Sequence, residues 1–197
     1  MSKIEIPVVY VKDFLEGGEK RDAFVKQVGD ALRDIGFFAV ADHGIPQELI
    51  KRAYQASSDF YDLDVDTKKK YEIETASGQR GYTSMYKEHA KDSGAPDIKE
   101  FYQVGRVDVA DDHEVHQAYG PNVWPTEIPD FSISIQDMYR KLDGLGKTLL
   151  EACALYLDEE KSFLTEMVDE GDTIVRVLYY PPLPADVPAG AIRAAAH

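Results

Sequence analysis

The longest regular pattern in the sequence is a set of apolar residues that recurs at helical spacing between residues 130 and 157. The pattern extends over about seven turns of an α-helix. Its members are Ile135, Met138, Leu142, Leu145, Leu149, Cys153 and Tyr156. A helix with one apolar stripe becomes stable by burying that stripe against other elements. The pattern therefore predicts a long spine helix whose stripe lies in a core.

The second strong pattern is typical of a β-strand. Residues 172–180 are rich in β-branched and aromatic side chains, and Pro181 and Pro182 follow them directly. Proline cannot donate a ladder hydrogen bond, so the strand is expected to stop there. Shorter patterns predict strands at 6–11, 37–41 and 98–107 and helices at 20–35 and 47–61.

The predicted strand at 98–107 separates its side chains into two sets. Period-two geometry places Phe101 and Gln103 on one face and Tyr102 and Val104 on the other. Two neighbouring segments are more polar: residues 66–70 predict a solvated helical turn, and residues 74–95, which contain three glycines, predict a loop.

Composition limits the partners. The chain has 36 acidic and 22 basic residues and a formal charge of −14, which would repel a phosphate backbone, so we expect no nucleic-acid partner. The only cysteine, Cys153, lies in an apolar run and is expected to be a buried, inert thiol in a reducing compartment. No apolar run has the length of a signal peptide or a membrane span, which predicts a cytoplasmic protein without a membrane partner.

The histidines do not form a metal site that is visible in the sequence alone. His113 and His116 would lie side by side on a helix, but they fall in an acidic segment that is more typical of an exposed loop. His43 precedes Gly44 and Pro46 and is expected to be a turn residue that bonds to local backbone.

Six segments together resemble the isopenicillin N synthase-like superfamily of 2-oxoglutarate- and Fe(II)-dependent oxygenases, and they occur in the family's order. They are Ile6-Pro7-Val8-Val9, Gly36 to Pro46, Arg80-Gly81-Tyr82, Asp97 to Phe101, Pro121 to Pro125, and Tyr179-Tyr180-Pro181-Pro182. One departure is Asp42, where the family commonly has asparagine.

The resemblance implies an α+β to mainly β fold, in which helices flank a double-stranded β-helix (jelly roll). It divides the chain into an N-terminal non-haem dioxygenase region at 1–120, spine helices at 121–171, and the start of the Fe(II)/2-oxoglutarate jelly-roll domain at 172–197. Most of the jelly roll is expected to lie beyond residue 197, so the fold is truncated in this chain.

The resemblance also implies an activity and a set of site residues. Family members are oxidoreductases (dioxygenases) that use Fe(II), the cosubstrate 2-oxoglutarate and O₂ to hydroxylate, desaturate or cyclise a small organic substrate. His197 lies 17 residues after Tyr180, which is the position of the first iron ligand, and the remaining ligands are expected beyond residue 197. Tyr180 resembles the tyrosine that donates to the cosubstrate. Arg80, Tyr82, Phe101 and Gln103 resemble residues that line the substrate pocket.

Two other functions remain open on the sequence. The protein could be an iron oxidase of the same fold that does not use 2-oxoglutarate, as isopenicillin N synthase is. Alternatively, it could be a non-catalytic scaffold or binding protein on this fold, with an incomplete set of metal ligands.

Overall fold

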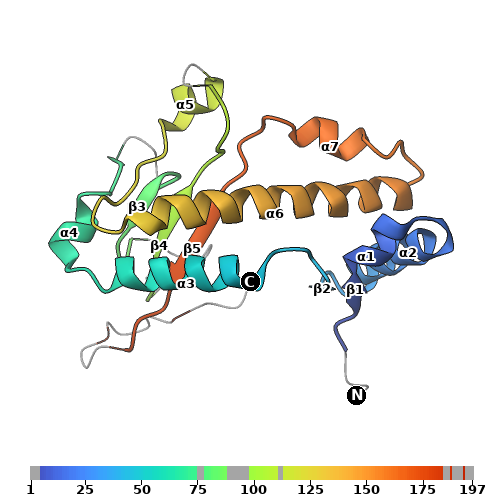
Figure 1. The fold of residues 1–197 in the computed structure, drawn as a ribbon, viewed down its shortest axis with the longest axis horizontal. Helices are drawn as coiled ribbons and strands as arrows, with labels where there is room; N and C mark the ends of the chain where they lie inside the picture. Colours follow the sequence, from blue (N-terminus) through green and yellow to red (C-terminus); the bar gives the residue numbers. More distant parts are fainter. Residues whose placement is uncertain are drawn as a thin grey trace. The chain divides into compact units, whose positions relative to one another are not determined.

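The computed structural model describes residues 5–74, 78–87, 98–110, 113–183, 187 and 193. The chain forms two compact units. Unit 1 contains Met1–Pro46 and Arg140–Gly171, and unit 2 contains Gln47–Tyr139 and Asp172–His197. The long helix α6 (Pro129–Tyr156) contributes its first part to unit 2 and the rest to unit 1 (Figure 1).

Unit 1 contains one two-stranded parallel sheet and several helices. β1 (Val8–Tyr10) pairs with β2 (Ala39–Ala41), so that Val9 lies opposite Val40. The helices of this unit, besides its part of α6, are α1 (Val11–Glu16), α2 (Gly18–Asp34) and α7 (Phe163–Val168). α7 runs alongside α6 (Figure 1), and a Lys161–Glu151 ion pair of 3.0 Å connects the segment before α7 to α6.

The strand predicted at 6–11 is shorter than expected, because the chain enters α1 at Val11. Val11 and Phe14 are both buried, and their spacing of three residues suits one face of a helix. Gly17, at φ 80°, ends this helix in a conformation that glycine adopts readily. The core of unit 1 contains Val9, Phe14, Phe24, Val28 and Ala152.

Unit 2 contains a three-stranded antiparallel sheet in the order β3-β4-β5. The strands are β3 (Gly81–Thr83), β4 (Glu100–Val104) and β5 (Val175–Tyr179). Gln103 of β4 lies opposite Gly81 on one side and Arg176 on the other. The helices of this unit, besides its part of α6, are α3 (Gln47–Tyr61), α4 (Val65–Lys69) and α5 (Glu114–Tyr119).

β3 lies in the segment that was predicted to be a loop, and that prediction was wrong for residues 81–83. Gly81 has φ +74°, and a side chain there would overlap the carbonyl oxygen of Tyr71. The glycine therefore permits the strand to pass close to neighbouring backbone. In the sequence alone, a glycine with this role cannot be distinguished from a glycine in a loop.

An aromatic cluster forms the core of unit 2. The ring of Phe60 contacts those of Tyr61, Tyr71, Tyr82, Tyr102 and Phe131 at centroid distances of 5.1–6.1 Å. Most of these pairs are edge-to-face, which the charge distribution of aromatic rings favours. Tyr102 and Val104 belong to this core, which confirms the predicted faces of β4.

The spine helix is confirmed, but its predicted stripe is partly wrong. Leu142 is 39% exposed, and the buried residues lie toward the two ends of α6. Phe131, Ile135 and Tyr139 enter the core of unit 2, and Ala152 enters the core of unit 1. A single stripe was predicted because helical periodicity cannot show that the two ends belong to different cores.

The described residues contain helices and two small sheets, and the complete jelly roll is not among them. The division at residues 120 and 171 remains a prediction. No helix in the described ranges is long and apolar enough to cross a bilayer.

Candidate functional site

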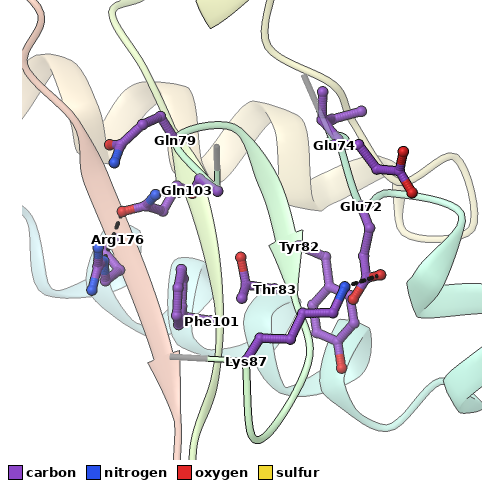
Figure 2. A pocket seen from close by; sticks show the side chains of 11 residues that line it. Glu72, Glu74, Gln79, Tyr82, Thr83, Lys87, Phe101, Gln103 and Arg176 are labelled. Carbon is purple, nitrogen blue, oxygen red and sulfur yellow. Dashed lines mark hydrogen bonds and ion pairs between the residues drawn. The ribbon is translucent and has the colours of Figure 1, made fainter. Parts of the chain in front are cut away.

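A pocket of about 290 Å³ lies over the β3-β4-β5 sheet in unit 2 (Figure 2). The three strands and the segments next to β3 supply its lining. The lining residues are Glu72, Ile73, Glu74, Gly78, Gln79, Tyr82, Thr83, Lys87, Phe101, Gln103 and Arg176.

The alternation of side chains along β4 and β5 explains which of their residues line the pocket. Phe101 and Gln103 line the pocket, whereas Tyr102 between them enters the aromatic core. On β5, Arg176 lies opposite Gln103 and reaches the same pocket, whereas Val175 and Val177 pack against the core. The apolar face of the sheet therefore anchors the strands, and the other face presents polar groups.

The side chain of Arg176 contacts those of both Gln103 and Phe101 (Figure 2). The guanidinium carbon of Arg176 lies 4.4 Å from the centroid of the Phe101 ring, a cation–π contact. Nε of Arg176 donates to Oε1 of Gln103 at 2.7 Å, and Nε2 of Gln103 donates to the carbonyl oxygen of Gly78. Because both ends of the Gln103 amide are bound, the amide holds the guanidinium in one orientation.

The opposite wall carries an ion pair. Nζ of Lys87 lies 2.6 Å from a carboxylate oxygen of Glu72 (Figure 2). The backbone N–H of Ser84 donates to the other carboxylate oxygen at 3.2 Å. Burial alone would raise the pKa of Glu72, but the hydrogen bonds from Lys87 and Ser84 outweigh it and lower that pKa below its usual range.

A buried polar network lies on the core side of the sheet. Nζ of Lys68 contacts the two carboxylate oxygens of Glu100 at 2.9 and 3.1 Å and the carbonyl oxygen of Tyr61 at 3.0 Å. The hydroxyl of Tyr82 donates to the same carboxylate. Burial, followed by the hydrogen bond to Glu100, raises the pKa of Tyr82. The turn at 66–70 is helical as predicted, but it is not solvated throughout, because Lys68 is only 5% exposed.

The structure brings three of the four predicted substrate residues to this pocket: Tyr82, Phe101 and Gln103. Tyr82 is 3% exposed, and its hydroxyl is directed to Glu100 rather than to the cavity.

Arg80 lies elsewhere. Its side chain is 1% exposed, donates to the carbonyl oxygen of Gln79 at 2.8 Å, and lies 3.3 Å from Asp172. The guanidinium packs where a side chain on Gly105 would otherwise be and lies over the ring of Tyr119. These contacts pack the Arg80 side chain within unit 2, away from the residues that line the pocket, and its substrate role remains a prediction.

Of the two residues predicted for the cofactors, Tyr180 lies in the described part of the chain. Tyr180 directly follows β5, is 38% exposed and is not among the residues that line the pocket. Its spacing from Arg176 and Leu178 places it on the pocket side of the strand. His197 lies outside the described residues.

His43 and His113 both accept hydrogen bonds from nearby backbone N–H groups. Nδ1 of His43 accepts from the backbone N–H of Ile45 at 3.1 Å, which confirms the turn role. His113 caps α5, where its Nδ1 accepts from Val115 N at 3.2 Å, so this segment is a short helix rather than a loop. Within the ranges that the structure describes, no group of three or more His, Cys, Asp or Glu side chains could hold a metal ion.

Cys153 is half-buried, and burial raises the pKa of its thiol, in agreement with the expected low reactivity.

Sequence reasoning missed Arg176, Glu72 and Lys87. Arg176 is the only charged residue between Thr173 and Tyr180 in an otherwise apolar or aromatic run. A single cationic residue within an otherwise apolar strand indicates that one face of the strand borders a polar site. Glu72 and Lys87 are 15 residues apart, and nothing in the sequence connects them.

Comparisons with known proteins extend these observations. Residues 6–127 match the family described as non-haem dioxygenase in morphine synthesis N-terminal. The 2-oxoglutarate-Fe(II) type oxidoreductase hxnY of Emericella nidulans is 31% identical over 176 residues, which cover 86% of this chain and 50% of the relative. The 2-oxoglutarate-dependent dioxygenase traH of Penicillium crustosum is 29% identical, with 89% of this chain and 56% of the relative covered. The chain therefore spans about half the length of these relatives.

Solved structures give a similar result. A protein of Caulobacter crescentus assigned to the 2OG-Fe(II) oxygenase family superposes with a TM-score of 0.81 at 34% identity, covering 93% of this chain and 59% of the other. A full-length Neurospora crassa protein in complex with α-ketoglutarate (2-oxoglutarate) gives a TM-score of 0.79 at 26% identity, covering 96% of this chain and 59% of the other.

Proposed function

The chain belongs to the non-haem dioxygenase family within the 2-oxoglutarate–Fe(II) oxygenase superfamily, and on this premise we propose that the full-length protein oxidises a small organic molecule with Fe(II), 2-oxoglutarate and O₂. The observation that carries the proposal is the superposition of 96% of the chain on a Neurospora crassa protein that was solved with α-ketoglutarate. Bound iron and 2-oxoglutarate would supply the activation of O₂, with 2-oxoglutarate converted to succinate and CO₂ as the substrate is oxidised.

The described residues do not by themselves form the iron site. We propose that His197 is one ligand of a site made of two histidines and one carboxylate, and that the other two ligands follow it in the full-length protein. Support comes from the position of His197 relative to Tyr180 in a chain that belongs to the family.

We propose that Tyr180 donates to the bound 2-oxoglutarate. Its place after β5, on the side of the strand that Arg176 shares, supports this role. Phe101 and Gln103 on the neighbouring strand would then form part of the wall around the substrate, because an oxidase must surround the group that it oxidises. Tyr82 contributes to the same wall mainly by anchoring β3 through Glu100.

The pocket supports a small substrate. Its volume of about 290 Å³ is at the lower end of ligand pockets, which are typically about 300–1,000 Å³. The Neurospora crassa protein was also solved with α-ketoglutarate and thymine, at a TM-score of 0.75 and 26% identity to this chain. A molecule of about one ring is therefore the size that we propose for the substrate.

The proposal is tested with the full-length protein supplied with Fe(II), 2-oxoglutarate and O₂. We expect succinate to form. The rate of succinate formation should increase when a substrate of about one ring is added. His197→Ala should abolish both succinate formation and Fe(II) binding, because one of three protein ligands is lost.

His116→Ala is the matched control, since this histidine lies on α5 and we assign it no role. Binding of 2-oxoglutarate without conversion to succinate would instead favour a non-catalytic binding protein. Turnover that needs iron but not 2-oxoglutarate would favour an oxidase that does not use this cosubstrate.

A further inference from the structure

We propose that Lys68, Glu100 and Tyr82 form a positioning network that fixes the register of β3 on β4 and thereby sets the shape of the pocket. The inference rests on the proposed function, in which this pocket receives the substrate, and it goes further by assigning the residues that hold the pocket wall in place. The network acts through Thr83 of β3 and Phe101 of β4, which both line the pocket.

The backbone ladder between β3 and β4 is short, because β3 contains only three residues. The ladder pairs Tyr82 with Tyr102 and Thr83 with Phe101. If β3 shifted by two residues, the same side chains would remain on each face, so the alternation of side chains does not exclude that shift. The shift would, however, separate Thr83 from Phe101, which lie side by side in the pocket wall (Figure 2).

The side chain of Tyr82 connects the two strands in one register only. Its hydroxyl donates to the carboxylate of Glu100, which lies two residues before Tyr102, the residue opposite Tyr82. A diagonal contact of this kind across an antiparallel pair is lost when one strand slips by two residues. Burial, followed by the hydrogen bond to Glu100, raises the pKa of Tyr82, so the hydroxyl keeps its proton and remains a donor.

Lys68 of α4 holds the carboxylate that Tyr82 binds. Nζ of Lys68 contacts the two carboxylate oxygens of Glu100 and the carbonyl oxygen of Tyr61, and these three contacts match the three N–H donors of an ammonium group. The same Nζ lies 5.7 Å from the centroid of the Tyr82 ring. Because both charged side chains are buried, a displacement that broke the pair would leave a charge without its partner, which is costly. Glu100 is therefore held in one place for Tyr82.

The experiment separates positioning from stability by comparing two tyrosines. Tyr82→Phe removes the hydroxyl that binds Glu100 and retains the ring. Tyr102→Phe is the matched control, because Tyr102 lies opposite Tyr82 in the same aromatic core and its hydroxyl donates to the carbonyl oxygen of Val123 at 2.8 Å. Both variants lose one buried hydrogen bond, but only Tyr82→Phe should loosen the register of β3.

Two measurements on the full-length protein report that register. Hydrogen exchange of the β3 amides, corrected for global stability from urea unfolding, should become about tenfold faster in Tyr82→Phe, because opening β3 no longer breaks a hydrogen bond to a charged group. In Tyr102→Phe it should stay within about threefold of wild type. Fluorine NMR of para-fluorophenylalanine in place of Phe101 reports the pocket wall. Wild type and Tyr102→Phe should show one environment, and Tyr82→Phe should show a second one by saturation transfer.

A second pair of variants tests the network while Tyr82 is kept. Lys68→Met with Glu100→Gln leaves no buried charge and retains an acceptor for the Tyr82 hydroxyl. Lys68→Met with Glu100→Leu removes the acceptor and should reproduce the behaviour of Tyr82→Phe. The β3 amides should exchange at least about threefold more slowly in the glutamine variant than in the leucine variant. This comparison is also the test if Tyr82→Phe does not fold.

The inference would be overturned if the fluorine signal at position 101 kept one unchanged environment in both Tyr82→Phe and the leucine variant. Equal acceleration of β3 exchange in Tyr82→Phe and Tyr102→Phe would overturn it as well. If the register depends on Tyr82 but the wild-type protein forms no succinate with Fe(II), 2-oxoglutarate and O₂, the network stands and the proposed oxygenase function fails. If succinate forms and the register is unchanged in the Tyr82 and Glu100 variants, the function stands and this inference fails.

Discussion

The ring of Tyr61, at the end of α3, stacks on the ring of Tyr179, at the end of β5, with centroids 4.9 Å apart and planes inclined by 12°. The hydroxyl of Tyr61 also donates to the carbonyl oxygen of Val177 at 2.7 Å. One side chain thus fixes β5 by ring stacking and by a hydrogen bond. Since Arg176 lies on the same strand, Tyr61 helps to hold the pocket wall from the core side.

We predict that Tyr61→Phe lowers the free energy of unfolding by about 0.5–1.5 kcal/mol, because it removes the hydrogen bond and retains the ring. Tyr61→Ala also removes the buried ring and should cost about 3–5 kcal/mol. Urea unfolding of the full-length protein measures both. Tyr54→Phe on the same helix is the control, because Tyr54 is 76% exposed and should show no change. Equal effects at the two tyrosines would contradict the assigned role.

Two helical glycines should respond to alanine in opposite directions. A side chain on Gly29 in α2 would overlap the ring of Tyr156 in α6, whereas Gly144 in α6 has open space around it. Gly29→Ala should therefore destabilise the protein by about 1–3 kcal/mol. Gly144→Ala should stabilise it by up to about 1 kcal/mol, because alanine favours a helix. Thermal or urea unfolding gives the sign, and a stabilising Gly29→Ala would show that the two helices do not approach so closely.

The Lys68–Glu100 pair should be sensitive to the loss of one partner. Both side chains are less than 10% exposed, at 7% and 4%, so Lys68→Met leaves a buried carboxylate without its cation. We expect a cost of about 3–5 kcal/mol. Replacing both residues, as Lys68→Met with Glu100→Gln, should recover part of that loss, and a double-mutant cycle measures the coupling. Lys69→Met at the neighbouring exposed position is the control and should change stability by less than about 0.5 kcal/mol.

Stability should depend on pH through Glu72. Its pKa is lowered in the folded protein, where the hydrogen bonds from Lys87 and Ser84 outweigh the effect of burial. A carboxyl group with a lowered folded pKa contributes stability above its unfolded pKa, of about 4.3, and loses it as the pH falls through the folded value. Lys87→Met should therefore destabilise the protein at pH 7, and the difference from wild type should shrink as the pH falls below about 4. A difference that stays constant between pH 7 and pH 3 would show that the pair makes no such contribution.

Local patterns predicted most of the secondary structure. The period of two at Phe101 and Gln103 gave the correct face of β4, and the helical period gave the extent of α6. Local patterns could not show which charges become buried. Lys68 lies among acidic and basic neighbours and looks solvated, and only the contact with Glu100, 32 residues away, explains its burial.

The candidate site was predictable in part for the same reason. The family resemblance and strand alternation identified Phe101 and Gln103, which line the pocket. Arg80 was selected from its motif, but its side chain packs against Gly105, a contact that is set by tertiary structure. Arg176 reaches the pocket only because β5 pairs with β4 in a register that places it beside Gln103, and a single strand does not specify its register with another.

The helix α6 has a consequence for how the protein unfolds. It supplies Phe131 and Ile135 to one core and Ala152 to the other, so melting this single helix removes packing from both units. If α6 melts as a whole, neither unit keeps its full set of core contacts. In native-state hydrogen exchange, the amides at the two ends of α6 should therefore exchange through the same rare global opening, as one cooperative folding unit rather than as two independent ones.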